Sequence, residues 1–153
     1  MSRKSKSFTL IELLVVIFII GLLAALVTSN VSRSRMKGRD ARRKADLNSI
    51  RTAVETYAME NGTMPGNCGT TACYSNDTTW PTLQTVLQNY IYPLPKDPTN
   101  NTSYHYKYTN STTDYKISAL LELSGDTDAA NDGGTNASYY ELFTIGGQSL
   151  NPI

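Results

Sequence analysis

Three aspartates near the C-terminus have a spacing that could bind a metal ion. Asp126, Asp128 and Asp132 lie within seven residues, and nearby glycines permit tight turns. A hard cation such as Ca²⁺ takes about six to eight oxygen ligands, which carboxylates in a turn can supply. The pattern departs from an EF-hand, because Asn131 and Ala137 stand where that loop needs Gly and Glu. Two interpretations stay open, a calcium site and a solvated acidic turn. Calcium is the one cofactor that the sequence suggests.

Two cysteines, Cys68 and Cys73, could form a disulfide. They lie close together in a stretch rich in Gly, Thr and Asn. Such pairs are oxidised outside the cytoplasm and reduced within it. A structural zinc site needs about four ligands, and the single histidine, His105, is distant in sequence. We therefore predict a disulfide, with free thiols as the alternative.

The sequence offers little catalytic machinery. It has one histidine, and it contains no Gly-x-Ser-x-Gly elbow, no phosphate-binding loop and no paired-carboxylate motif. His105 lies between two tyrosines on the outward register of an expected strand, so we interpret it as a surface residue. We expect that the protein is not an enzyme.

Glu12 is the single charge in the apolar run 8–27. A helix over this run would be about 30 Å long, enough to cross a bilayer. A carboxylate at mid-membrane costs about 2.5–3.5 kcal/mol, so it usually has a function. If the chain is cut before Phe8, the new α-amino group lies four residues from Glu12 and can neutralise it in the same chain or in a neighbouring subunit. A signal peptide has a shorter apolar core, and an ordinary signal anchor leaves Glu12 unexplained.

Basic residues flank the apolar run on both sides. A cluster over residues 3–6 precedes it and another over 33–44 follows it, so positive-inside counting does not fix the orientation. The run 39–46 contains four cations and could suggest nucleic acid. We favour a solvated helix face, or pairing with acids of neighbouring subunits, because no DNA-reading motif is present. Nucleic acid is not expected as a partner.

The apolar pattern predicts that the helix continues beyond the membrane, over residues 8–60. One face of it carries residues spaced at three and four positions, and Asn61-Gly62 then gives a stop signal. The residues of this face are Leu47, Ile50, Val54, Tyr57 and Ala58.

The C-terminal domain, residues 61–153, is expected to hold a small antiparallel sheet. Alternating side chains predict three strands, and a short helix precedes them, whereas 62–81 reads as irregular. Three strands need a covering layer, and the helix face described above supplies it. The predicted class is α+β, with strands at 104–108, 115–123 and 139–145 and the short helix at 83–90.

The stretch Lys6 to Ile17, KSFTLIELLVVI, resembles the prepilin processing signature shared by type IV pilins and type II secretion pseudopilins. In that family a membrane aspartyl peptidase cleaves before the Phe and methylates the new N-terminus, and the Glu supports subunit docking. The resemblance implies processing between Ser7 and Phe8, loss of the leader 1–7, and an assembly role for Glu12. Ser7 stands where the family usually has Gly.

Two further stretches are similar to the major type II secretion pseudopilin. One is Leu-Asn-x-Ile-x-x-Ala-x-x-x-Tyr over residues 47–57, and the other is Leu-Pro-x-Asp-Pro over 94–98. This resemblance implies a pilin fold, with 8–27 as membrane span and filament core, and calcium binding in the C-terminal region. It implies a structural filament subunit of type II secretion. A type IV pilus fibre subunit or a competence pilin, acting in adhesion or DNA uptake, is the alternative.

The same resemblance implies partners and a location. The partners are identical subunits, minor pilins, the prepilin peptidase, and an inner-membrane platform with its ATPase. The chain is expected to be a single-pass protein of the inner membrane with its C-terminal domain outside the cytoplasm. After assembly it would form a periplasmic or extracellular filament.

Overall fold

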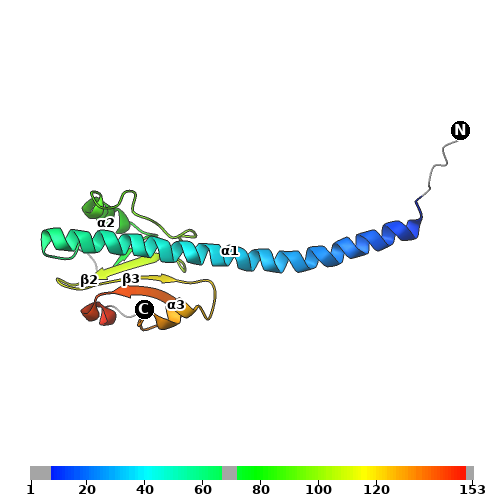
Figure 1. The fold of residues 1–153 in the computed structure, drawn as a ribbon. Coiled ribbons are helices and arrows are strands. Elements are labelled where there is room, and N and C mark those ends of the chain that lie inside the picture. Colours follow the sequence, from blue (N-terminus) through cyan, green and yellow to red (C-terminus); the bar gives the residue numbers. More distant parts are fainter. Residues whose placement is uncertain (1–7, 67–71, 151–153) are drawn as a thin grey trace. The chain divides into compact units, whose positions relative to one another are not determined.

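A computed structural model describes residues 8–66 and 72–150 of the chain. The chain divides into two compact units, Met1–Met36 and Lys37–Ile153. We call them the N-terminal unit and the head unit. One helix of 52 residues, α1 (Leu10–Asn61), runs through the boundary between them (Figure 1).

Helix α1 ends where the sequence predicted. Gly62 has a positive φ of 72° and donates its N–H to the carbonyl of Ala58 at 2.9 Å. Glycine adopts this left-handed conformation without the steric cost that a Cβ brings. The predicted stop at Asn61-Gly62 is therefore confirmed.

The head unit contains a four-stranded antiparallel sheet in the order β1-β2-β3-β4. The predicted strands are present with shifted ends, and the additional strand β1 has two residues that pair with Lys107 and Tyr108 of β2. The last strand ends at Phe143, and residues 145–149, of which only Ile145 was assigned to it, form a short 3₁₀ helix, η1 (Ile145–Ser149). The strands are β1 (Cys73–Tyr74), β2 (Tyr106–Asn110), β3 (Tyr115–Leu120) and β4 (Tyr139–Phe143).

Two short helices complete the head unit. Helix α2 (Trp80–Leu87) begins three residues earlier than predicted, with proline in its first turn, where a missing N–H costs nothing. Helix α3 (Thr127–Asn131) was not predicted, and it lies within the acidic stretch between β3 and β4.

The core of the head unit lies between α1, α2 and the sheet. Leu47, Ile50 and Val54 of α1 are fully buried, which confirms the predicted covering face. Strands β2 and β3 run alongside this part of α1 (Figure 1). The indole of Trp80 is also buried, and it donates a hydrogen bond to the carbonyl of Pro95 at 3.0 Å. The remaining buried apolar residues of this cluster are Cys73, Leu83, Leu87, Leu94, Tyr106, Tyr108, Tyr115, Ile117 and Ala119.

Three tyrosine hydroxyl groups bind acids on the part of α1 that belongs to the head unit. They donate to carboxylates at distances of 2.6 to 2.8 Å, and the acids are spread over the outer turns of the helix. The pairs are Tyr106 with Asp46, Tyr115 with Glu55, and Tyr90 with Glu60.

Cys73 and His105 are the one cysteine and the one histidine among the described residues. Cys73 is buried in β1, whereas Cys68 lies outside the described residues, so their disulfide stays a prediction. The ring of His105 is half-buried and packs edge-on against Tyr74, with centroids 5.4 Å apart. His105 is thus less exposed than the sequence suggested.

Candidate assembly site

The N-terminal unit presents an uncovered apolar surface. Every side chain from Phe8 to Ala25 is exposed, and Leu10 reaches 82%. Among the described residues, α1 is the one helix long and apolar enough to cross a membrane, judged by length and composition. A surface of this size and polarity requires either lipid or other apolar helices around it.

Glu12 and Thr9 form a capping box at the start of α1. One carboxylate oxygen, Oε2, accepts hydrogen bonds from the backbone N–H and the hydroxyl of Thr9, both at 2.8 Å. In return, the N–H of Glu12 donates to the Thr9 hydroxyl at 3.3 Å. These bonds satisfy polar groups that a helix leaves unpaired at its N-terminus.

The capping box gives Glu12 a local role that our sequence reasoning missed. Its signal, Thr followed three residues later by Glu before an apolar run, is present in the sequence. An apolar environment makes the role more important, because unpaired N–H groups are costly without water. Ser7 lies outside the described residues, so processing between Ser7 and Phe8 stays a prediction.

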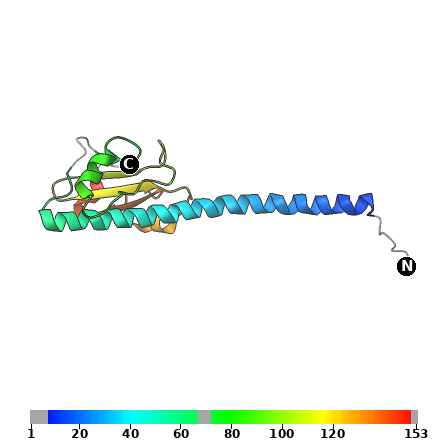
Figure 2. The same cartoon turned by 90° about the horizontal axis from the view of Figure 1, so that it is seen from above.

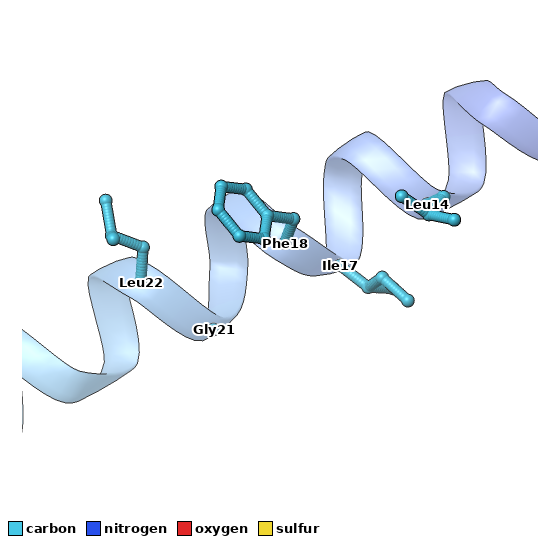
Figure 3. A pocket seen from close by; sticks show the side chains of 5 residues that line it. All are labelled: Leu14, Ile17, Phe18, Gly21 and Leu22. Atoms are coloured by element: carbon cyan, nitrogen blue, oxygen red, sulfur yellow. The ribbon is translucent and has the colours of Figure 1, made fainter.

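A shallow apolar groove lies on the N-terminal unit around Gly21. Figure 3 shows the bare backbone of Gly21 between the side chains of Phe18 and Leu22, with Ile17 and Leu14 one and two turns earlier. A Cβ at Gly21 would meet no atom of the described residues within 4 Å. Packing within the chain therefore does not require this glycine, whereas close approach of a second helix would.

The acidic stretch of the head unit is organised around Lys44 of α1. Asp126 is the N-cap of α3, because its carboxylate accepts from the N–H groups of Asp128 at 3.0 Å and Ala129 at 3.2 Å. The same carboxylate binds the Lys44 ammonium at 2.6 and 2.7 Å, and Asp128 binds it at 2.7 Å. The structure thus brings Asp126 and Asp128 together, because both carboxylates bind the same ammonium group.

Asp132, the third predicted ligand, has different partners. Its carboxylate accepts from the N–H groups of Gly134 at 2.7 Å and Glu141 at 2.8 Å, and burial raises its pKa. In the described part of the chain, no three acidic, histidine or cysteine side chains converge as a metal site. The residues as arranged do not fit calcium, because an ammonium already lies between two of the three carboxylates. The predicted calcium site would therefore require calcium to displace this ammonium.

The cations at the centre of the basic run of α1 form ion pairs within their own chain. Arg43 is fully buried and binds Asp40 at 2.7 Å, Asp97 at 2.7 and 3.0 Å, and Glu122 at 2.8 Å. Arg39 also holds Glu122 with two parallel hydrogen bonds, one of them 2.7 Å long. The hydrogen bonds from Arg39, together with Arg43, lower the pKa of Glu122 to about 2. We call Arg39, Asp40, Arg43, Asp97 and Glu122 the ion cluster.

The ion cluster fixes the segment after β3 to α1. Asp40 accepts from the N–H groups of Glu122 at 2.9 Å and Leu123 at 3.0 Å. Our interpretation of this run as a solvated or intermolecular face is therefore wrong for Arg39, Arg43 and Lys44. Four of their acidic partners, Asp97, Glu122, Asp126 and Asp128, lie 54 to 84 residues away in the same chain, and Arg43 also binds Asp40, three residues before it.

Comparison with known proteins assigns the chain to a family. The model of the prokaryotic N-terminal methylation motif matches residues 2–28, and the model of type II secretion system (T2SS) protein G matches residues 30–139. The type II secretion system core protein G of Vibrio cholerae is 31% identical over 105 residues, 68% of this chain and 71% of that protein. The Escherichia coli core protein G is 34% identical over 104 residues, 64% and 69% of the two chains.

The core protein G of Dickeya chrysanthemi is 33% identical over 100 residues, 64% of this chain. The match spans 65% of that relative, just under two thirds of its length. No solved structure matches this chain significantly. The family model of protein G covers well over half of the sequence, so this chain belongs to the type II secretion system protein G family.

Proposed function

We propose that this chain is a major pseudopilin, a membrane-inserted precursor that is cut before Phe8 and assembled into a filament through the N-terminal part of α1. The observation that supports this most directly is the exposed apolar surface from Phe8 to Ala25, which carries one acid, Glu12, in its first turn. In a soluble monomer this apolar surface would stay exposed to water. A bilayer and a bundle of like helices both cover it.

Assembly moves this surface from lipid to protein. In the precursor the apolar helix crosses the inner membrane once, with the head unit outside the cytoplasm. In the pseudopilus the helices pack against each other, so lipid contacts are exchanged for helix contacts with little net hydrophobic cost. The groove around Gly21 is suited to this packing, since it allows a neighbouring helix to approach the backbone closely.

Glu12 would pair with the α-amino group that cleavage creates at Phe8 of a neighbouring subunit. The pair neutralises two charges that are costly in an apolar filament core. Further proposed partners are minor pilins, the prepilin peptidase, and the inner-membrane platform with its ATPase. The capping box complicates this role, because the same carboxylate also satisfies Thr9 at the helix start.

Three variants separate docking by the charge of Glu12 from capping of the helix. Glu12→Gln removes the charge and keeps an amide oxygen that completes a capping box. Thr9→Ala breaks the box and keeps the charge, and Glu12→Ala removes both. Each variant is expressed with the secretion machinery, and we measure membrane insertion by fractionation and filament content by shearing and electron microscopy.

We expect all three variants to insert, Thr9→Ala to assemble, and both Glu12 variants to fail in assembly. Normal filaments from Glu12→Gln would contradict docking by charge and leave capping as the role of this residue. Mass spectrometry of the wild-type filament tests processing separately. Subunits that retain residues 1–7 in functional filaments would overturn the proposed maturation.

DNA uptake, the alternative function, finds less support in the head unit. Phosphate binding depends on accessible cations. Arg39, Arg43 and Lys44 bind carboxylates of their own chain, and Arg43 is fully buried. Arg43 is therefore not accessible to a nucleic acid backbone, and Arg39 and Lys44 already bind carboxylates, so we make no proposal for DNA binding.

A further inference from the structure

The ammonium group of Lys44 lies in a cage built from the acidic stretch. Its nitrogen is 2.6 and 2.7 Å from the two oxygens of Asp126 and 2.7 Å from one oxygen of Asp128. The ring of Tyr140 lies beside it, with its centroid 5.7 Å from the nitrogen. An ammonium has three donors, and three carboxylate oxygens surround it here. The side chains of Lys44 and Asp126 are only 20% and 19% exposed.

The cage joins two parts of the head unit that are distant in sequence. Figure 2 shows α3, in orange, beside the cyan part of α1 that carries Lys44. Asp126 holds the lysine and also caps α3, so one carboxylate fixes both the helix start and its attachment to α1. Without a cation between them, the carboxylates of Asp126 and Asp128 would repel each other.

We infer that Lys44 is an internal cation that takes the place of a divalent ion between Asp126 and Asp128, so that this turn is ordered without calcium. The ammonium is tethered to α1 and therefore has a high effective concentration at the carboxylates. A free Ca²⁺ ion would have to displace it, and it would gain few further oxygen ligands, because Asp132 is engaged elsewhere.

The charge state of Lys44 is compatible with this role. Burial lowers its pKa, but the hydrogen bonds with Asp126 and Asp128 outweigh burial, and the pKa is raised overall. The raised pKa keeps the ammonium charged around neutral pH.

The experiment compares melting temperatures of the full chain in detergent, with EDTA and with millimolar CaCl₂. The wild type should melt at the same temperature in both. Lys44→Met should lower the melting temperature in EDTA by roughly 2–8 °C, the shift that a modest loss of stability gives across small and medium-sized domains. Calcium should recover part of the loss, because it can neutralise the two carboxylates that the substitution leaves without the ammonium.

Lys37→Met is the matched control, since Lys37 is an exposed lysine of the same helix, and it should melt like the wild type. The inference is overturned if calcium stabilises the wild type by several degrees, or if Lys44→Met melts like Lys37→Met. If Lys44→Met does not fold, Asp126→Asn gives the same test, because Asn caps a helix as well as Asp but lacks the charge. A wild-type melting temperature for Asp126→Asn would then refute the role of Lys44.

Discussion

Replacing Arg43 by methionine removes the centre of the ion cluster and should strongly destabilise the head unit. The guanidinium has five N–H donors, and they make five hydrogen bonds, to Asp40, Asp97, Glu122 and Thr99, at 2.7 to 3.1 Å. Its side chain is 0% exposed, and those of Asp40 and Asp97 are 3% and 0% exposed. Removing one member of a buried ion pair costs about 3–5 kcal/mol, because the remaining charges stay buried without a partner.

The measurement is urea unfolding of the full chain in detergent, followed by circular dichroism. Arg42→Met is the control at the neighbouring position, because Arg42 is 67% exposed and lies 3.6 Å from Asp46. An exposed pair contributes at most about 1 kcal/mol. The double variant Arg43→Met with Asp97→Asn should recover part of the loss, since it removes one of the unpaired charges.

Two outcomes would refute this reasoning. If Arg43→Met unfolds at the same urea concentration as Arg42→Met, the ion cluster does not stabilise the head unit. If the double variant is no more stable than Arg43→Met, the penalty does not come from unpaired buried carboxylates. Arg43→Lys should also be destabilised, because an ammonium cannot bind Asp97 with two parallel hydrogen bonds.

The pH dependence and one glycine provide further tests. Arg39 holds the pKa of Glu122 below its ordinary value of 4.5, at about 2, so its contribution to stability is complete above about pH 4.5 and is lost as pH falls towards 2. Glu122→Gln should flatten this part of the pH profile, and an unchanged profile would count against the pairing. Gly147→Ala should cost about 1–3 kcal/mol, because its Cβ would lie 2.0 Å from the carbonyl oxygen of Tyr115. Gly66→Ala, whose Cβ meets nothing within 4 Å among the described residues, should unfold like the wild type.

Periodic features of this fold could be read from the sequence. The apolar face of α1 and the three longer strands repeat at the spacings that helices and half-buried strands impose. The stop at Asn61-Gly62 has a local cause in glycine chemistry. The family match confirms the expected class of protein, a structural pseudopilin rather than an enzyme.

Other features had no local signal. Strand β1 has two residues, too few for an alternation to be visible. The short helix α3 depends on the cap at Asp126, and the same aspartate suggested a metal ligand instead. The partners of Lys44, and Asp97 and Glu122 among those of Arg43, lie more than 50 residues away, and no single sequence reveals such pairs. The capping box is different. Thr9 and Glu12 are three residues apart, so this motif could have been predicted from the sequence.

The three tyrosine–carboxylate bonds have a mechanical consequence. Their acceptors, Asp46, Glu55 and Glu60, extend over 15 residues of α1, a rise of roughly 21 Å along an α-helix. A force along the helix axis is therefore shared among attachment points spread along α1, rather than concentrated at one of them. A head that is fastened in this way travels with its helix when the helix is pulled.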